Sequence, residues 1–320
     1  MSNIKNDLIE IINALSKIVS SLDEVEIPKS KVSKGSKRKT EYLEPTKENL
    51  EKFGLNGNNI VVATEPIIVS KRTTEYIKAT KVNLKKYNLD SSKVTINSDS
   101  SIDYDGDVDL SERNLEEIPF KFNKVSGDFY CSKNQLTSLE FAPVEVGGDF
   151  GCWKNQLTSL EFAPKKVGGS FDCDNNQLTS LEGSPKEVGG YFSCSRNQLT
   201  SLEGAPKKVG GGFKCNENQL TSLKGSPQEV SGNFYCYNNQ LTSLEFAPKK
   251  VGGDFDCENN QLTSLEFAPQ KVGGWFNCSY NQLTSLKGSP KEVGGGFWCH
   301  RNQLTSLKGK PEYIGGDFYK

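Results

Sequence analysis

Two groups of carboxylates in this 320-residue chain have the residue type and spacing that acid–base chemistry uses. One group holds Asp172 and Asp174, and the other holds Asp254, Asp256 and Glu258. Residues two apart on a strand share a face, so each group converges as the paired carboxylates of glycosidases do. Like charges on a polar binding surface give the same pattern. Glycoside hydrolysis is therefore the weakest of three functions considered, and we expect the chain not to be an enzyme.

Histidine-dependent nucleophilic catalysis is the second chemistry to consider. The single histidine, His300, lies in a stretch rich in aromatic residues. The serines of the recurring LTSL segment occupy framework turns, so we expect no Cys or Ser nucleophile to be free to pair with His300. His300 is therefore predicted to be a contact residue of a binding surface rather than a general base.

The nine cysteines have the wrong spacing for a metal site. Zinc sites use pairs of ligands two to four residues apart, whereas these cysteines recur every 21 residues. One Cys at a fixed place in each repeat indicates a stacked core position, where a free thiol behaves as a small hydrophobe. We expect no metal, no cofactor and reduced thiols, which favours a cytoplasmic location. The positions are Cys131, Cys152, Cys173, Cys194, Cys215, Cys236, Cys257, Cys278 and Cys299.

A 21-residue repeat must position all of these side chains. Its unit reads V-G-G-x-F-x-C-x-x-N-Q-L-T-S-L-E-(G/F)-(A/S)-P-x-x, and the segment NQLTSL occurs nine times, first at Asn134 and last at Asn302. A divergent copy precedes these nine units, and a partial tenth copy begins at Gly315. Each unit predicts one short strand around F-x-C, and stacked units predict a parallel sheet with ~4.8 Å between strands. Phe, Cys and Leu are expected to point inward as ladders.

The repeat resembles the leucine-rich repeat, whose pattern is L-x-x-L-x-L-x-x-N-x-L-x-x-L. The residues that match it include Phe150, Cys152, Asn155, Leu157 and Leu160, and the resemblance covers residues 106–320. It implies an α/β repeat solenoid, a leucine-rich-repeat horseshoe with a parallel β-sheet on its concave face. The Pro after each NQLTSL is typical of the bacterial type, which has an extended convex side. The wording NQLTSLEGxP with GGxFxC is similar to arrays carried by phages and large DNA viruses.

The residues before the array divide into three further segments. Residues 1–27 predict an amphipathic, coiled-coil helix, and residues 28–40 predict a flexible basic linker. Residues 41–105 predict a small duplicated α+β domain. The apolar residues of the helix alternate spacings of four and three, so we expect residues 2–23 to support a homo-oligomer. They are Ile4, Leu8, Ile11, Leu15, Ile18 and Leu22.

The duplication sets residues 37–55 against residues 71–89, with 11 of 19 positions identical. Each copy offers a threonine as the helix N-cap and a Gly or Asn as the helix stop; in the second copy these are Thr80 and Asn88. An apolar segment follows each helix and predicts a strand. We therefore expect two strand–helix–strand units that shield the first turn of the array, because repeat arrays need capping.

Comparison of the repeats separates the framework from the positions that vary. The variable positions are the residue before Phe, the residue between Phe and Cys, and the two residues after Cys. We expect them to face outward from the concave sheet, and all three tryptophans lie at them. Trp and Tyr dominate binding hot spots, so we predict a binding surface on this face. Its centre is expected in the C-terminal half, at Tyr235, Tyr237, Trp275, Tyr280 and Trp298. The predicted binding residues are Tyr130, Trp153, Tyr191, Tyr235, Tyr237, Trp275, Tyr280, Trp298, His300 and Arg301.

Charge and composition narrow the class of partner. The formal net charge is −1, and basic residues at the variable positions are too sparse for nucleic acid. The chain has no apolar run of membrane-spanning length, so no membrane partner is expected. We predict a non-enzymatic interaction protein that binds a protein partner, is encoded by a phage or virus, and acts in the host cytoplasm or the virion. A glycan-binding receptor-recognition module is the alternative.

Overall fold

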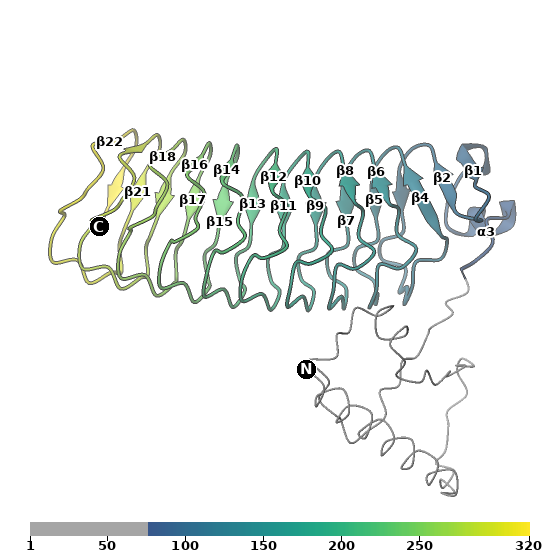
Figure 1. Cartoon of the computed structure of the whole chain (residues 1–320), viewed down its shortest axis with the longest axis horizontal. Helices are drawn as coiled ribbons and strands as arrows, with labels where there is room; N and C mark the ends of the chain where they lie inside the picture. The colour runs from purple at the N-terminus through teal and green to yellow at the C-terminus, as the bar shows by residue number, and fades with distance from the viewer. Residues whose placement is uncertain (1–75) are drawn as a thin grey trace, which may run out of the picture. The chain divides into compact units, whose positions relative to one another are not determined.

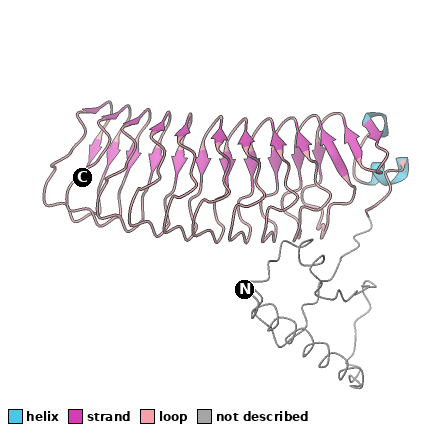
Figure 2. Ribbon diagram, in the orientation of Figure 1, coloured by secondary structure: helices cyan, strands magenta, loops and turns pink. Residues whose placement is uncertain are grey.

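The computed structural model describes residues 76–320, which form one row of stacked coils (Figure 1). The predicted helix 1–27, with residues 2–23 in it, the linker 28–40 and the first copy of the duplicated segment lie outside the described residues. Within the described part, the coils form the expected repeat solenoid with a parallel sheet. Most coils contribute two short strands joined by the Gly-Gly turn (Figure 2).

The main sheet is the one that the F-x-C segments predict. It has eleven strands that pair in parallel, with Phe opposite Phe in neighbouring coils. The Phe is buried because it points into the core, and the next residue points away from it. The strands are β3 (Val108–Asp109), β5 (Phe129–Tyr130), β7 (Phe150–Gly151), β9 (Phe171–Asp172), β11 (Phe192–Ser193), β13 (Phe213–Lys214), β15 (Phe234–Tyr235), β17 (Phe255–Asp256), β19 (Phe276–Asn277), β21 (Phe297–Trp298) and β23 (Phe318–Tyr319).

The expectation of one strand per unit, with an extended convex side, is wrong. Most coils have a second short strand, and these strands form a second sheet. The Lys-Val or Glu-Val pair before each Gly-Gly turn forms a strand, with Val buried and the charged residue exposed. A two-residue strand is too short to show the alternation that marks strands in a sequence. The strands are β1 (Val94–Ile96), β2 (Ile102–Tyr104), β4 (Phe122–Val125), β6 (Glu145–Val146), β8 (Lys166–Val167), β10 (Glu187–Val188), β12 (Lys208–Val209), β14 (Glu229–Val230), β16 (Lys250–Val251), β18 (Lys271–Val272), β20 (Glu292–Val293) and β22 (Tyr313–Ile314).

The second sheet is interrupted between β12 and β14. At this place Ser231 replaces the first glycine of the turn. In neighbouring coils a Cβ at that glycine would lie about 2 Å from a backbone oxygen of the previous coil, as at Gly189, where it would be 1.9 Å from the oxygen of Gly168. Ser126 occupies the same place in its own turn, yet β4 pairs there with both β2 and β6, so the serine at 231 does not by itself explain the interruption.

The core is a set of side-chain ladders that run along the array. Neighbouring Phe rings stack, for example Phe150 on Phe171 with 5.2 Å between ring centroids. The cysteines and the leucines of NQLTSL are buried beside them, as predicted. All nine cysteines are free, and burial raises the pKa of thiols such as that of Cys215 well above its usual range. The thiols therefore stay protonated and act as core hydrophobes.

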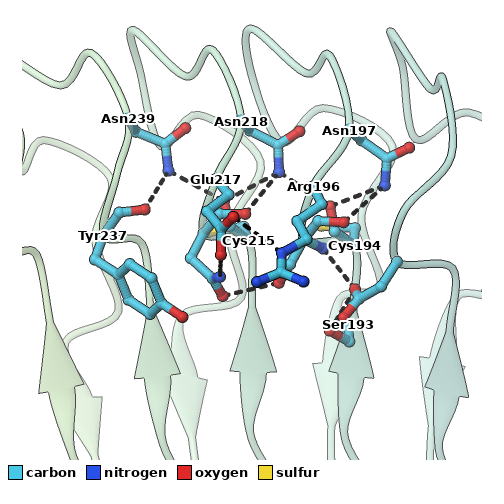
Figure 3. Close-up of polar contacts among 12 residues, drawn as sticks. Ser193, Cys194, Arg196, Asn197, Cys215, Glu217, Asn218, Tyr237 and Asn239 are labelled. Carbon is cyan, nitrogen blue, oxygen red and sulfur yellow. Dashed lines mark hydrogen bonds and ion pairs between the residues drawn. The ribbon is translucent and has the colours of Figure 1, made fainter.

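The repeated asparagine bridges neighbouring coils, as the sequence predicts. The side-chain nitrogen of Asn155 donates to the carbonyl oxygens of Cys152 and Cys131, both at 3.0 Å, and its oxygen accepts from Leu136 N–H at 3.0 Å. Figure 3 shows three successive members of this ladder in the middle of the array, Asn197, Asn218 and Asn239. Because each asparagine satisfies backbone groups that the turn leaves unpaired, its invariance is structural.

Residues 76–89, the described part of the second copy of the duplicated segment, pack against the first coil. Helix α3 (Lys81–Lys86) has the predicted N-cap at Thr80, and Asn88 has a left-handed φ of 60° after its end. The short 3₁₀ helix η1 (Ser91–Lys93) and β1 follow, and β1 pairs antiparallel with β2 at the end of the second sheet. The ring of Tyr87 lies 5.3 Å from that of Phe120, so this segment shares its core with the array.

Candidate binding surface

The outer face of the main sheet is defined here by the four variable positions of each coil. The first three positions lie along the F-x-C strand. The fourth, the second residue after Cys, turns the chain away from the sheet. That residue has a left-handed backbone in each of the nine full coils, for example φ 53° at Tyr280 and φ 56° at Arg301. Non-glycine residues rarely adopt this conformation, so the turn projects their side chains at the rim of the outer face.

Five aromatic side chains meet on this face and form an aromatic ribbon. The ring of Tyr235 lies 6.0 Å from that of Trp275 and 6.3 Å from that of Tyr237. Trp275 stacks on Trp298 at 5.0 Å with 19° between the ring planes. The ring of Tyr319 meets that of Trp298 edge-on at 6.4 Å. The structure thus brings together four of the five residues that the sequence predicts as the centre of the site, and it adds Tyr319.

The ribbon covers a carboxylate. Tyr235 lies on β15 and Trp275 comes just before β19, so their rings meet across β17, which lies between these strands. Asp256 of β17 faces the same way as Tyr235, yet only 7% of it is exposed. Burial raises the pKa of Asp256 to about 7. The neighbouring Asp254 fixes one edge of the ribbon, because its Oδ1 accepts the backbone N–H of Trp275 at 2.9 Å.

Tyr280, predicted as part of the centre, lies apart from the ribbon with His300. Tyr280 is 46% exposed, and its ring meets that of His300 edge-on at 5.4 Å. The hydroxyl of Ser279 lies 3.0 Å from His300 Nδ1, which corrects the expectation that no serine is free to pair with this histidine. Ser279 is fully buried, however, so its hydroxyl has no route to a substrate and the pair ties two coils together.

The predicted aromatic residues of the N-terminal half are engaged by lysines instead of by one another. The Nζ atoms of Lys133 and Lys154 lie 4.9 and 5.4 Å from the ring of Trp153. Lys214 Nζ lies 5.4 Å from the ring of Tyr191. Such cation–π contacts occupy the ring faces within the chain itself. These rings are therefore less available to a partner than the ribbon is.

Acidic neighbours engage the remaining aromatic residue of that half, Tyr130. Its hydroxyl donates to Asp128 Oδ2 at 3.2 Å, and a longer contact of 3.4 Å reaches Asp149 Oδ2. Burial, followed by the charges of these two carboxylates, raises the pKa of Tyr130. The phenol therefore stays protonated and holds two coils together.

The carboxylates considered for catalysis bind the backbone of adjacent residues and coils. Asp174 Oδ1 accepts from the Ser193 hydroxyl and from Ser195 N–H, both at 2.6 Å. Asp172 Oδ1 accepts from Asp174 N–H at 2.9 Å. Burial and then the charge of Asp174 raise the pKa of Asp172 to about 6. The hydrogen bonds give these residues a structural role, which the sequence did not reveal.

The second group behaves in the same way. Asp256 Oδ1 accepts from Glu258 N–H at 3.0 Å, and Glu258 Oε2 accepts from the side chain of Asn277 at 2.8 Å. Among residues 76–320, no group of three or more His, Cys, Asp or Glu side chains is placed to hold a metal ion. No helix in this part of the chain is long and apolar enough to cross a membrane.

A shallow polar hollow of about 230 Å³ lies beside the ribbon, on the coils of β9 to β15. Tyr235 belongs to both the hollow and the ribbon. Figure 3 shows three of the side chains that line it, Arg196, Glu217 and Tyr237. This site was not predicted from the sequence, although Arg196 and Glu217 are 21 residues apart and therefore occupy the same position in adjacent coils.

No protein-family model matches the chain, and no curated protein sequence matches it. Among solved structures, YopM from Yersinia enterocolitica WA-314 is similar, with 18% sequence identity and a TM-score of 0.25. The likeness covers 67% of this chain, which spans 64% of the length of that YopM chain.

Proposed function

We propose that this chain is a non-enzymatic binding protein that engages a protein partner through the outer face of its main sheet. The observation that carries the proposal is the aromatic ribbon, in which Tyr235, Trp275 and Trp298 stack at 6.0 and 5.0 Å on an exposed side of a sheet. These rings have no part in the core, because the Phe and Cys ladders already fill it. Clustered Trp and Tyr side chains of this kind are the usual anchors of protein interfaces.

The orientation of the rings favours a protein over a glycan. A sugar stacks on the open face of an aromatic ring, but the ribbon rings lie face against face, with 16° between Tyr235 and Trp275 and 19° between Trp275 and Trp298. The ends of the stack are flanked by Tyr237 and Tyr319. The ribbon therefore presents ring edges, which suit the apolar and aromatic side chains of a protein.

The proposal excludes catalysis on the same face. The carboxylates that could act as acid and base accept backbone hydrogen bonds from neighbouring residues, as Asp172 and Asp256 do. The buried Ser279 cannot reach a substrate beside His300. A binding role leaves each of these contacts intact.

The test uses a ligand selected on the full-length chain from phage-displayed fragments of natural proteins. Trp275→Ala and Trp298→Ala should each weaken binding by about 2 kcal/mol, which is roughly 30-fold. The melting temperature should change by only about a degree or two, because the rings are on the surface. Trp153→Ala is the matched control, since Trp153 lies on the same face but outside the ribbon. Equal losses at all three positions, or no loss at Trp275 and Trp298, would contradict the proposal.

The finer proposals rest on sequence alone. The wording of the repeat supports a phage or viral origin and a place in the host cytoplasm or the virion. The apolar seam in residues 2–23 supports a homo-oligomer, and light scattering tests it. The number of chains per particle should fall when the chain begins at residue 37, and an unchanged number would contradict the oligomer.

A further inference from the structure

We propose that the hollow beside the ribbon binds a carboxylate of the protein partner, so that an acidic side chain lies next to the apolar anchor. This inference rests on the proposed function, because it names the chemistry of the partner at one place on the same face. It follows from which hydrogen-bonding groups of the hollow are already engaged and which remain free.

The acceptors of the hollow are largely engaged within the chain. Asp174 Oδ1 accepts two hydrogen bonds from the adjacent coil. Asn216 Oδ1 accepts from the Ser195 hydroxyl at 2.8 Å. Glu217 Oε2 accepts from Arg196 Nε at 2.9 Å, and its Oε1 is 3.4 Å from the side-chain nitrogen of Asn216. A ligand that brought donors would have to break these contacts.

The donors, in contrast, are mostly free. Among the described residues, the ammonium of Lys214, the terminal guanidinium nitrogens of Arg196 and the hydroxyl of Tyr237 have no hydrogen-bond partner. Asn216 is 5% exposed, and its side-chain nitrogen has only the long contact to Glu217. Arg196 is exposed and Lys214 and Tyr237 are half-buried, so oxygen atoms of a ligand can reach these donors.

Two of the free donors are cationic, which selects an anionic oxygen group. Arg196 and Lys214 supply the basic charge of the outer face from β9 to β19. A guanidinium whose Nε is already bonded still offers its terminal nitrogens to a carboxylate. Asp174 and Glu217 offset the two cations, so the hollow carries no excess charge. Recognition therefore depends on the directed donors, and the Tyr237 hydroxyl adds one between the hollow and the ribbon.

The neighbouring ribbon favours a carboxylate on a protein over a free anion. Tyr235 lines the hollow and stacks in the ribbon, so one continuous surface offers directed donors next to ring edges. An Asp or Glu beside a large apolar side chain fits both parts at once. An inorganic anion or an acidic sugar would use the hollow alone.

The test is an NMR titration of the full-length chain that monitors the Arg196 Nε–H and the Asn216 side-chain amide. The probes are N-acetylglutamate and, as its matched neutral control, N-acetylglutamine. We expect both signals to shift with N-acetylglutamate and not with the control. Lys214→Gln and Tyr237→Phe should each weaken binding by about tenfold, the effect of losing one charge-assisted contact. Lys154→Gln, which removes a lysine outside the hollow, should change nothing.

Two further arms separate the outcomes. Trp298→Ala should leave this titration unchanged, because the probe binds in the hollow and not on the ribbon. A negative titration would therefore overturn the carboxylate site but would leave the ribbon as the proposed anchor. Unshifted signals, or shifts that survive Lys214→Gln and Tyr237→Phe together, would overturn the proposal. Tighter binding of glucuronate or of sulfate than of N-acetylglutamate would assign the hollow to an acidic glycan or an inorganic anion and would also overturn it.

Discussion

The two sheets of each coil have the same kind of interior and opposite exteriors. Both point an invariant apolar residue inward, Phe in the main sheet and Val in most strands of the second. Outside, the second sheet carries ion pairs between adjacent coils, such as Lys208 with Glu187 at 2.8 Å and Lys250 with Glu229 at 3.1 Å. The outer face of the main sheet has an ion pair too, between Arg196 and Glu217, but it differs in carrying the aromatic ribbon.

The difference between the two exposed faces indicates that one interacts with water and that the other is suited to a partner. Exposed ion pairs contribute about 0–1 kcal/mol each, and they keep the second sheet and its strand edges hydrated. Large aromatic side chains on the opposite sheet gain nothing from water, and their clustering favours contact with a partner. Under the proposed function, the coil keeps charged side chains on one side and presents the binding surface on the other, while the interior is constant.

A substitution in the core that the two sheets share should have the largest effect on the free energy of unfolding. Cys215→Asp buries an unpaired carboxylate where the thiol is fully enclosed, so it should lower the free energy of unfolding by about 3–5 kcal/mol. Denaturant unfolding measures the change, and Gln219→Asp, at an exposed position of the same coil, is the control. If Cys215→Asp melts like the unaltered chain, Cys215 is not a core residue.

The buried carboxylate beneath the ribbon should give the next largest effect, and it depends on pH. The pKa of Asp256 is raised to about 7 by burial, so the folded chain holds this proton more tightly than the unfolded chain does. The contribution of Asp256 to stability is therefore greatest below about pH 4 and is lost as the pH rises to about 7. Asp256→Asn should leave stability unchanged at low pH and raise it by about 2–4 kcal/mol at pH 8.

Unfolding midpoints of the Asp256→Asn variant and the unaltered chain, compared across this range, check the sign. Asp254→Asn is the control, because Asp254 is the neighbouring carboxylate on the same coil. A difference between Asp256→Asn and the unaltered chain that stays constant with pH would mean that this carboxyl is not buried by the ribbon.

The turn that joins the two sheets gives an intermediate effect. Gly189→Ala would place its Cβ 1.9 Å from the backbone oxygen of Gly168, so we expect a loss of about 1–3 kcal/mol in the free energy of unfolding and weaker pairing between β8 and β10. Ser231→Ala is the matched control, because that turn already accommodates a Cβ. Hydrogen exchange of the Val188 and Gly189 amides reports the weakened pairing, and unchanged protection would contradict the close approach of the two turns.

The exterior of the second sheet should give the smallest effect. Lys208→Gln removes one exposed ion pair, so it should change stability by less than about 1 kcal/mol and leave partner binding unaltered. A binding loss as large as that of Trp298→Ala would mean that the second sheet is part of the interface.

The sequence predicts the interior far better than the exterior. A spacing of 21 residues locates every member of the Phe, Cys, Leu and Asn ladders, because an invariant residue in stacked coils must repeat its surroundings. The second sheet escapes prediction, since a charged residue followed by Val shows no strand periodicity.

Which side chains meet on the outer face depends on how far they reach across neighbouring strands. The spacing of residues in the sequence does not give this reach. The meeting of Tyr235 and Trp275 across a whole strand requires both rings to lean over Asp256. Tyr280 has the right residue type, but its own backbone is left-handed, and this turn directs its side chain away from the ribbon. The hollow could have been found by aligning the variable positions coil by coil, because its residues come from successive repeats.

Tryptophan fluorescence tests the central claim most directly, since all three tryptophans of the chain lie on the outer face of the main sheet. In a Trp153→Phe variant the emission comes from Trp275 and Trp298 alone. Adding the selected ligand should shift this emission to shorter wavelength and protect it from acrylamide, because the ribbon becomes buried. A Trp275→Phe, Trp298→Phe variant, which keeps only Trp153, should show neither change. Unprotected emission from the ribbon tryptophans in a saturated complex would contradict the account and place the interface elsewhere.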